Sequence, residues 1–218
     1  MSRLAGVTPI PPDFAARYRA RGYWEDIPLG RFYDRVFTSH GDSLALISGD
    51  ERVTYKELKE RIDRLALHLL ELGVAPLDRW VLQMPNIPEF VYLYFALQRL
   101  GAIPIMALAG HRWNEINAFF ELSGASGYAV SERLGDLDSQ QLIAQIREAH
   151  PRLQVVLGVE RIREMIGRPP RSDQGLLDAI EIDPDEPCIF QLSGGTTGVP
   201  KLIPRTNNDY VYNTKAAV

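Results

Sequence analysis

The sequence predicts an α/β fold with a largely parallel sheet flanked by helices. From residue 54 onward, short apolar runs of strand length alternate with longer segments whose apolar residues recur at helical spacing. The connections between these segments are short, and no internal repeat or low-complexity tract interrupts them. Strands that alternate with helices over short connections typically form a parallel sheet with helices on its faces.

The first part of the chain, 1–50, is a loosely patterned lead-in. It holds several prolines, which precede a predicted short helix over 13–21. At its end, a strand over 43–48 is followed by a Gly-Asp turn and a second strand over 52–54, a pattern that indicates a hairpin.

Stronger signals begin at Thr54. With Glu57 three positions on, Thr54 forms a capping box for an amphipathic helix that Gly73 ends. Further strands are predicted over 80–84, 102–108, 127–131, 153–159 and 188–193, and further helices over 88–100, 111–122, 140–148 and 161–166. The proline-rich, charged stretch 167–187 is expected to be a surface connection and not a domain boundary.

Composition narrows the class of protein. The net charge of −4 gives no global attraction for nucleic acid or an anionic membrane, so neither is an expected partner. The single cysteine, Cys188, excludes an intrachain disulfide framework and is expected to be a small buried apolar residue. The longest apolar run, 90–97, is too short to span a bilayer, and the first residues lack the apolar core of a signal peptide. The expected location is cytoplasmic.

A glycine-rich loop, SGGTTGVPK, directly follows the last predicted strand. Glycines there let the backbone N–H groups approach an anion closely, hydroxyl groups add donors, and a lysine adds positive charge. The spacing is neither that of a Walker A loop nor GxGxxG, so it predicts a phosphate-binding loop in general, with a surface turn as the alternative. The candidate phosphate ligands are Ser193, Gly194, Gly195, Thr196, Thr197, Gly198 and Lys201.

The same loop resembles the signature loop of the acyl-adenylate-forming (AMP-binding) superfamily. VTYKEL at 53–58 and LQRLGAIPIMAL at 97–108 resemble two further motifs of that superfamily, in the right order. The flanking segments RGYWEDIPLG, PNIPEFVYLYFALQRLGAIPIMALAGHRWNEI and FQLSGGTTGVPKLIPRTNNDYVYN resemble the stand-alone aryl-acid–AMP ligases of siderophore biosynthesis.

The resemblance implies a ligase that uses ATP and Mg²⁺. It would convert an aryl acid, 2,3-dihydroxybenzoate ahead of salicylate, to aryl-AMP, and then pass the acyl group to the phosphopantetheine thiol of an aryl carrier protein. Residues 1–218 would be the N-terminal part of an adenylation domain, whose C-terminal portion is absent, and no catalytic residue is assigned within them. The chain alone is therefore expected to be inactive or nearly so. Two alternatives stay open: an aryl-CoA ligase, and a noncatalytic, nucleotide-binding short paralogue.

Other polar residues have weaker assignments. The four histidines, His40, His68, His111 and His150, lack ligand spacing, so no metal site is predicted among them. For His111, a role at a helix start is favoured over one in a ligand loop, while Arg205 is either a phosphate contact or a surface charge. The resemblance leads us to expect a histidine after LIPRT, and Asn207 stands there, which puts any proton transfer at this position in doubt.

Overall fold

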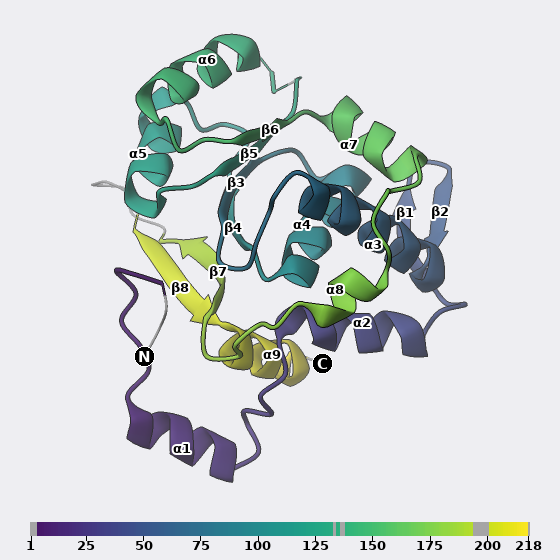
Figure 1. The fold of residues 1–218 in the computed structure, drawn as a ribbon, viewed down its shortest axis with the longest axis vertical. Helices are drawn as coiled ribbons and strands as arrows, with labels where there is room; N and C mark the ends of the chain where they lie inside the picture. Colours follow the sequence, from purple (N-terminus) through teal and green to yellow (C-terminus); the bar gives the residue numbers. More distant parts are fainter. Residues whose placement is uncertain (1–3, 133, 136–137, 194–200, 218) are drawn as a thin grey trace.

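The protein is built on one six-stranded sheet, seen in a computed structural model that describes residues 4–132, 134–135, 138–193 and 201–217 (Figure 1). The strand order is β6-β5-β3-β4-β7-β8, and every pair is parallel except β7 with β8. The strands are β3 (Arg79–Gln83), β4 (Ile103–Ala107), β5 (Gly127–Val130), β6 (Val155–Leu157), β7 (Pro187–Leu192) and β8 (Leu202–Thr206). The expected fold class, a largely parallel sheet flanked by helices, is confirmed.

Helices cover both faces of this sheet (Figure 1). One face carries α3 (Tyr55–Glu71), α4 (Pro88–Leu100) and α7 (Val159–Gly167), and the other carries α5 (Trp113–Ser123) and α6 (Ser139–Ala149). Successive residues of β3 serve the two faces in turn: Trp80 and Leu82 pack with α3 and α4, and Val81 packs with α5. The buried strands are apolar on both sides because both faces are covered.

The helix signals read from the sequence are confirmed at α3 and α4. The Thr54 hydroxyl accepts a hydrogen bond from the Glu57 N–H at 3.3 Å, and the Glu57 carboxylate accepts from the Thr54 N–H at 2.8 Å, which completes the capping box. Pro88 occupies the first turn of α4, and Gly101 ends the helix in the left-handed conformation with φ 71°.

Four elements were not predicted: α2 (Leu29–Ser39), α8 (Gly175–Ala179), β8 and α9 (Asn207–Ala216). Helix α8 corrects the expectation that 167–187 is only a surface connection, because Leu177 within it is fully buried against the core beside α3. A separate two-stranded antiparallel sheet, β1 (Leu44–Ser48) with β2 (Glu51–Thr54), precedes α3 as expected.

Helices α2 and α9, far apart in the sequence, lie side by side (Figure 1). Helix α1 (Pro12–Ala20) leads to α2, which packs on α3 and α4 and also touches α9. A separate cluster of buried residues, Leu29, Cys188, Ile189 and Val211, joins α2, β7 and α9. The lead-in is therefore packed against β7, which leads into the predicted phosphate loop, and against α9, which follows the hairpin.

Candidate functional site

The predicted phosphate loop is carried by a β-hairpin of β7 and β8. The last paired residues are Leu192 and Leu202. Beyond them the Ser193 N–H donates to the Lys201 carbonyl at 3.0 Å, and the Lys201 N–H donates to the Ser193 hydroxyl oxygen at 3.1 Å. These two hydrogen bonds close the neck of the loop, so that the first and the last predicted ligands lie next to each other.

Only part of the predicted ligand set falls within the described residues. Ser193 and Lys201 are described, and Lys201 is exposed. Gly194, Gly195, Thr196, Thr197 and Gly198 lie outside the described residues, so their phosphate contacts stay a prediction. The Ser193 oxygen accepts from Lys201, which leaves its own O–H to donate elsewhere.

The neck of the loop lies at the carboxyl ends of the parallel strands. Helix α4 joins β3 to β4 over one face, and α5 joins β4 to β5 over the other. The connections that leave the neighbouring strands β3 and β4 therefore go to opposite faces of the sheet. Such a switch point is where open α/β sheets bind ligands, in the crevice outside the carboxyl ends of their strands. Strand β7, which leads into the loop, is the next strand beside β4.

Gln83, at the end of β3, links β5 and the loop after β4 at this switch point. Its side chain is completely buried, and its amide group donates to the His111 carbonyl at 2.8 Å. The amide oxygen accepts the hydroxyl proton of Tyr128 on β5. Burial raises the pKa of the Tyr128 hydroxyl, which stays neutral and donates. One signal for Gln83 was present in the sequence, a polar residue that ends a buried strand, but its partners are 28 and 45 positions away.

His111 lies in the loop that follows β4, ahead of the helix. Helix α5 begins at Trp113, so the favoured helix-start role is wrong for the His111 side chain. The ring nitrogen Nδ1 accepts from the Leu108 N–H at 3.2 Å, and the ring packs edge-on against Phe119. Burial lowers the pKa of His111, which keeps the ring neutral and leaves its proton on Nε2.

A groove adjoins Lys201 on the face that α5 covers. It encloses about 830 Å³ and runs along β8 from Lys201 toward Arg79 and Arg152. Phe190, Leu202 and Pro204 give it an apolar floor. The Arg79 guanidinium is already engaged, since it donates to the carbonyl groups of residues 77, 123 and 124.

The Arg205 side chain is engaged by neighbours within the hairpin and α9. Its guanidinium pairs with Asp209 and donates to the Gln191 side chain at 3.3 Å. The hydrogen bond to Asp209 raises the pKa of Arg205. Asn207 begins α9 at the opposite end of β8 from Lys201, roughly 20 Å from it at the rise of an extended strand. Both residues therefore belong to the base of the hairpin.

Cys188 is buried as expected, and its thiol donates to the Arg205 carbonyl at 3.4 Å. Burial raises the pKa of the thiol, so the sulfur is protonated. Over the described ranges, no group of three or more His, Cys, Asp or Glu side chains is placed to hold a metal ion. Nor does any helix in the described part of the chain have the length and apolar character to cross a membrane.

The architecture defines the class of protein. The chain superposes on the apo structure of MbtA from Mycobacterium smegmatis with a TM-score of 0.87 and 38% identity, over 100% of this chain and 41% of that one. Its fold is that of the N-terminal domain of adenylate-forming enzymes. The AMP-binding enzyme family model matches residues 33–218, and the chain belongs to that family.

Several named relatives are similar to this chain over nearly all of its length. Triostin synthetase I of Streptomyces triostinicus is 44% identical over 98% of this chain. The 2,3-dihydroxybenzoate-AMP ligase of Bacillus subtilis is 36% identical over 99% of it, and the salicylyl-CoA synthase / salicylate adenylyltransferase of a Streptomyces species is 38% identical over 96%. The chain covers 40% of each of these three proteins, so it spans about two-fifths of their length.

Proposed function

We propose that this chain binds the phosphates of ATP in an aryl-acid–AMP ligase. The enzyme would activate an aryl acid, 2,3-dihydroxybenzoate ahead of salicylate, in siderophore biosynthesis. The observation that carries the proposal is the closed neck of the β7–β8 hairpin. It places the Ser193 hydroxyl beside the backbone N–H of Lys201, at the carboxyl ends of the parallel strands. The relatives named as 2,3-dihydroxybenzoate-AMP ligases from Bacillus subtilis and Vibrio cholerae, 36% and 39% identical, support the choice of acid.

The donors of this loop suit the leaving group of adenylation. A carboxylate oxygen of the aryl acid attacks the α-phosphorus of ATP, the bond from that phosphorus to the β-phosphate oxygen breaks, and pyrophosphate leaves with the electron pair. The Lys201 ammonium and the donors from Ser193 to Gly198 would hold the β- and γ-phosphates and offset that charge. Mg²⁺ would arrive with ATP and neutralise part of the phosphate charge.

The second half-reaction moves the acyl group to a thiol. The sulfur of a phosphopantetheine arm attacks the acyl carbon of aryl-AMP, the bond to the AMP oxygen breaks, and the thiol proton is released. An aryl carrier protein is the proposed acceptor. Coenzyme A is the alternative, and the Streptomyces relative named both a salicylyl-CoA synthase and a salicylate adenylyltransferase favours keeping it. Supplying full-length enzyme with either acceptor separates the two.

Lys201→Ala tests phosphate binding in an enzyme of the relatives' full length. We expect aryl-acid-dependent ATP–pyrophosphate exchange to slow by about 100-fold, because a lost charge-stabilising donor costs about 3 kcal/mol of barrier. The matched control is Lys56→Ala, an exposed lysine of α3, which should leave the exchange rate unchanged. Unchanged exchange in Lys201→Ala would overturn the assignment. The 218 residues alone should show little or no exchange, and robust activity there would contradict the proposed division of the site.

A further inference from the structure

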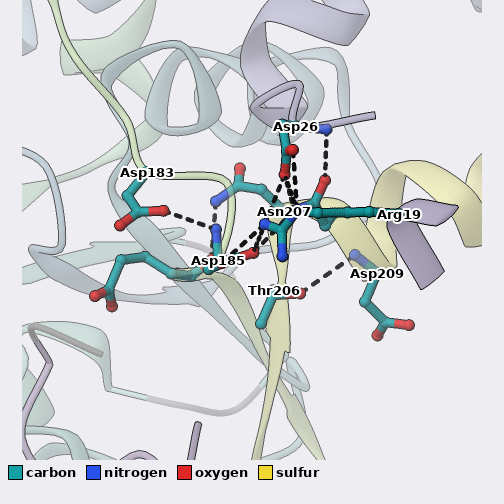
Figure 2. A network of polar contacts seen from close by, with 9 residues as sticks. Arg19, Asp26, Asp183, Asp185, Thr206, Asn207 and Asp209 are labelled. Atoms are coloured by element: carbon teal, nitrogen blue, oxygen red, sulfur yellow. Dashed lines mark hydrogen bonds and ion pairs between the residues drawn. The ribbon is translucent and has the colours of Figure 1, made fainter. Parts of the chain in front are cut away.

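Two adjacent asparagines, Asn207 and Asn208, join the base of the hairpin to the lead-in. Figure 2 shows the polar network around Asn207. Asn207 and Asn208 are the first two residues of α9 and are only 3% and 1% exposed. Their side chains bond to residues 178 and 182 positions earlier in the chain, and to the turn just before β7. Buried amides with such partners fix the relative positions of the segments that they join.

Asn207 bridges three segments. Its side-chain oxygen accepts from the Leu29 N–H at 2.9 Å, and its side-chain nitrogen donates to the Glu186 carbonyl at 2.9 Å. Its backbone N–H donates to the same carbonyl at 3.1 Å. Glu186 directly precedes β7, and Asn207 directly follows β8, so these bonds cross the open end of the hairpin.

The bond to Leu29 satisfies a backbone donor at the start of α2. Leu29 is the first residue of α2, and its N–H is one of the donors that a helix leaves unpaired. The N-cap position is Pro28, whose side chain makes no capping bond. Asn207 therefore supplies an acceptor for one of the unpaired N–H groups at the start of α2 from a distant part of the chain.

Asn208 ties the same region to the segment between α1 and α2. Its side-chain oxygen accepts from the Asp26 N–H, and its nitrogen donates to the carboxylates of Asp26 and Asp185, all at 2.9 Å. Arg19 donates to both carboxylates (Figure 2). The hydrogen bond from Arg19 holds the pKa of Asp26 below its usual value.

The hairpin lies at the edge of the sheet, and its pairing is irregular near its base. Among the described strands, β8 lies at the edge of the sheet, and the β4–β7 register is defined at one pair, Ile105 with Phe190. The β7–β8 register shifts between Pro187 and Ile189, where Cys188 is the extra residue. The buried Gln98 of α4 donates to the Cys188 carbonyl at 2.8 Å and so satisfies the irregular position.

We propose that Asn207 is a positioning residue for the phosphate loop: by tying the first turn of α2 to both strands at the base of the hairpin, it sets the register that brings Ser193 opposite Lys201. A slip by one residue would turn every side chain of β8 to the other face and separate this pair. The role in ATP use rests on the proposed function, but the register itself does not.

Disulfide trapping tests the register in the chain itself. Gln191 and Ile203 are paired across the hairpin, so cysteines introduced at both should form a disulfide. Asn207→Ala in this background should slow its formation about tenfold and yield off-register products in peptide mapping. Asn213→Ala, an exposed asparagine of the same helix, is the matched control and should behave like the parent. Equal rates and products in both variants would overturn the proposal.

Hydrogen exchange provides a second measurement. The amide protons of Ser193 and Lys201 should lose about tenfold in protection in Asn207→Ala, while those of Val81 and Leu82 in β3 keep theirs. If Asn207→Ala does not fold, Asn207→Asp keeps the acceptor for Leu29 but loses the donor to Glu186, and should show the same selective loss. A uniform loss that includes β3 would mean a purely global effect and contradict the proposal.

ATP kinetics in the full-length enzyme connect the register to the reaction. Asn207→Ala should raise the KM for ATP about tenfold and leave the KM for the aryl acid unchanged. If the neck opens and the KM for ATP does not change, Asn207 sets the register without positioning the phosphate ligands, and the proposal fails. If no variant, the parent included, uses ATP, the proposed function fails while the register result stands.

Discussion

At the residue scale, buried amide side chains connect parts of the backbone that the regular hydrogen-bond ladders leave unsatisfied. Gln83 donates to the His111 carbonyl in the loop after β4, and Gln98 donates to the Cys188 carbonyl at the extra residue of β7. Asn207 accepts from the first N–H of α2. Each amide offers both a donor and an acceptor and carries no charge. Their contacts are therefore independent of pH, whereas an ionised group at the same depth would cost several kcal/mol to bury.

Gln83→Met should destabilise the protein by about 1–3 kcal/mol. The thioether keeps the volume of the side chain but leaves the Tyr128 hydroxyl without its acceptor and removes one of the two donors to the His111 carbonyl, the other being Arg112. Urea unfolding of the variant measures this loss. Tyr128→Phe should cost less in the Gln83→Met background than in the wild type, because its hydroxyl is already unsatisfied there. Strictly additive free energies would show that the two side chains are not coupled.

Residues that lie close together in sequence could be predicted to lie at one place in the fold, whereas phosphate binding by them stays a prediction. Ser193 and Lys201 were identified from one nine-residue pattern, and the structure places them together at the neck of the loop. Asn207 was noted only as a departure from the expected histidine. Its structural role could not be predicted, since its partner Leu29 lies 178 positions away and no local pattern encodes that contact.

At the element scale, the crossing of α2 over α4 depends on a glycine. A Cβ atom at Gly30 would lie 2.3 Å from the Gln98 carbonyl oxygen, closer than any side chain tolerates. Gly30→Ala should therefore push the two helices apart and lower the free energy of unfolding by more than about 2 kcal/mol. Because Gln98 also bonds to Cys188, the shift should reach β7.

Gly41→Ala is the matched control for that variant. The nearest atoms to a Cβ at Gly41 lie at 3.8 Å, an ordinary contact, so its unfolding midpoint in urea should stay close to that of the wild type. Similar midpoints for the two variants would show that the helices adjust without cost and that the close approach at Gly30 is not needed.

The boundaries of elements were predictable where stop and start signals are strong. Helix α4 was predicted over its full length, 88–100, because Pro88 begins it and Gly101 ends it. Strand β8 was missed because a proline and an arginine interrupt its apolar pattern, and α9 because its residues are almost evenly polar around the helix. Both are held by β7 and by α2, which is information that lies elsewhere in the chain.

At the scale of the whole molecule, two histidines should make stability depend on pH. Burial lowers the pKa of His111 and of His150 below their usual 6.5, so the unfolded chain binds more protons in mildly acidic solution. The contribution of these two histidines to stability should be constant above about pH 7.5 and fall as the pH drops through about 6.5. The urea midpoint at about pH 8 and about pH 5 measures the difference.

His150→Gln separates the contribution of His150 to the pH dependence of stability from that of the carboxylates. Glutamine retains a donor for Asn117, to which the His150 ring is bonded at 2.7 Å, and it does not titrate. The variant should show a smaller loss of stability on acidification. Carboxyl groups with lowered pKa values, such as Asp26 and Asp178, act in the same direction but below their usual 3.8. An unchanged pH dependence in His150→Gln would exclude this histidine as a source.

The distant acceptor at the start of α2 also has a consequence for the order of events during synthesis. The acceptor of the Leu29 N–H, Asn207, is synthesised 178 residues after Leu29. At typical rates of translation that interval is roughly 10–35 s, long compared with the microseconds in which a helix forms. The layers around β3, β4 and β5, with α2 packed on α3 and α4, can assemble on the ribosome while the Leu29 N–H still lacks Asn207. Docking of α9 onto α2 would then follow as a later step, slow because its contacts join residues far apart in the sequence.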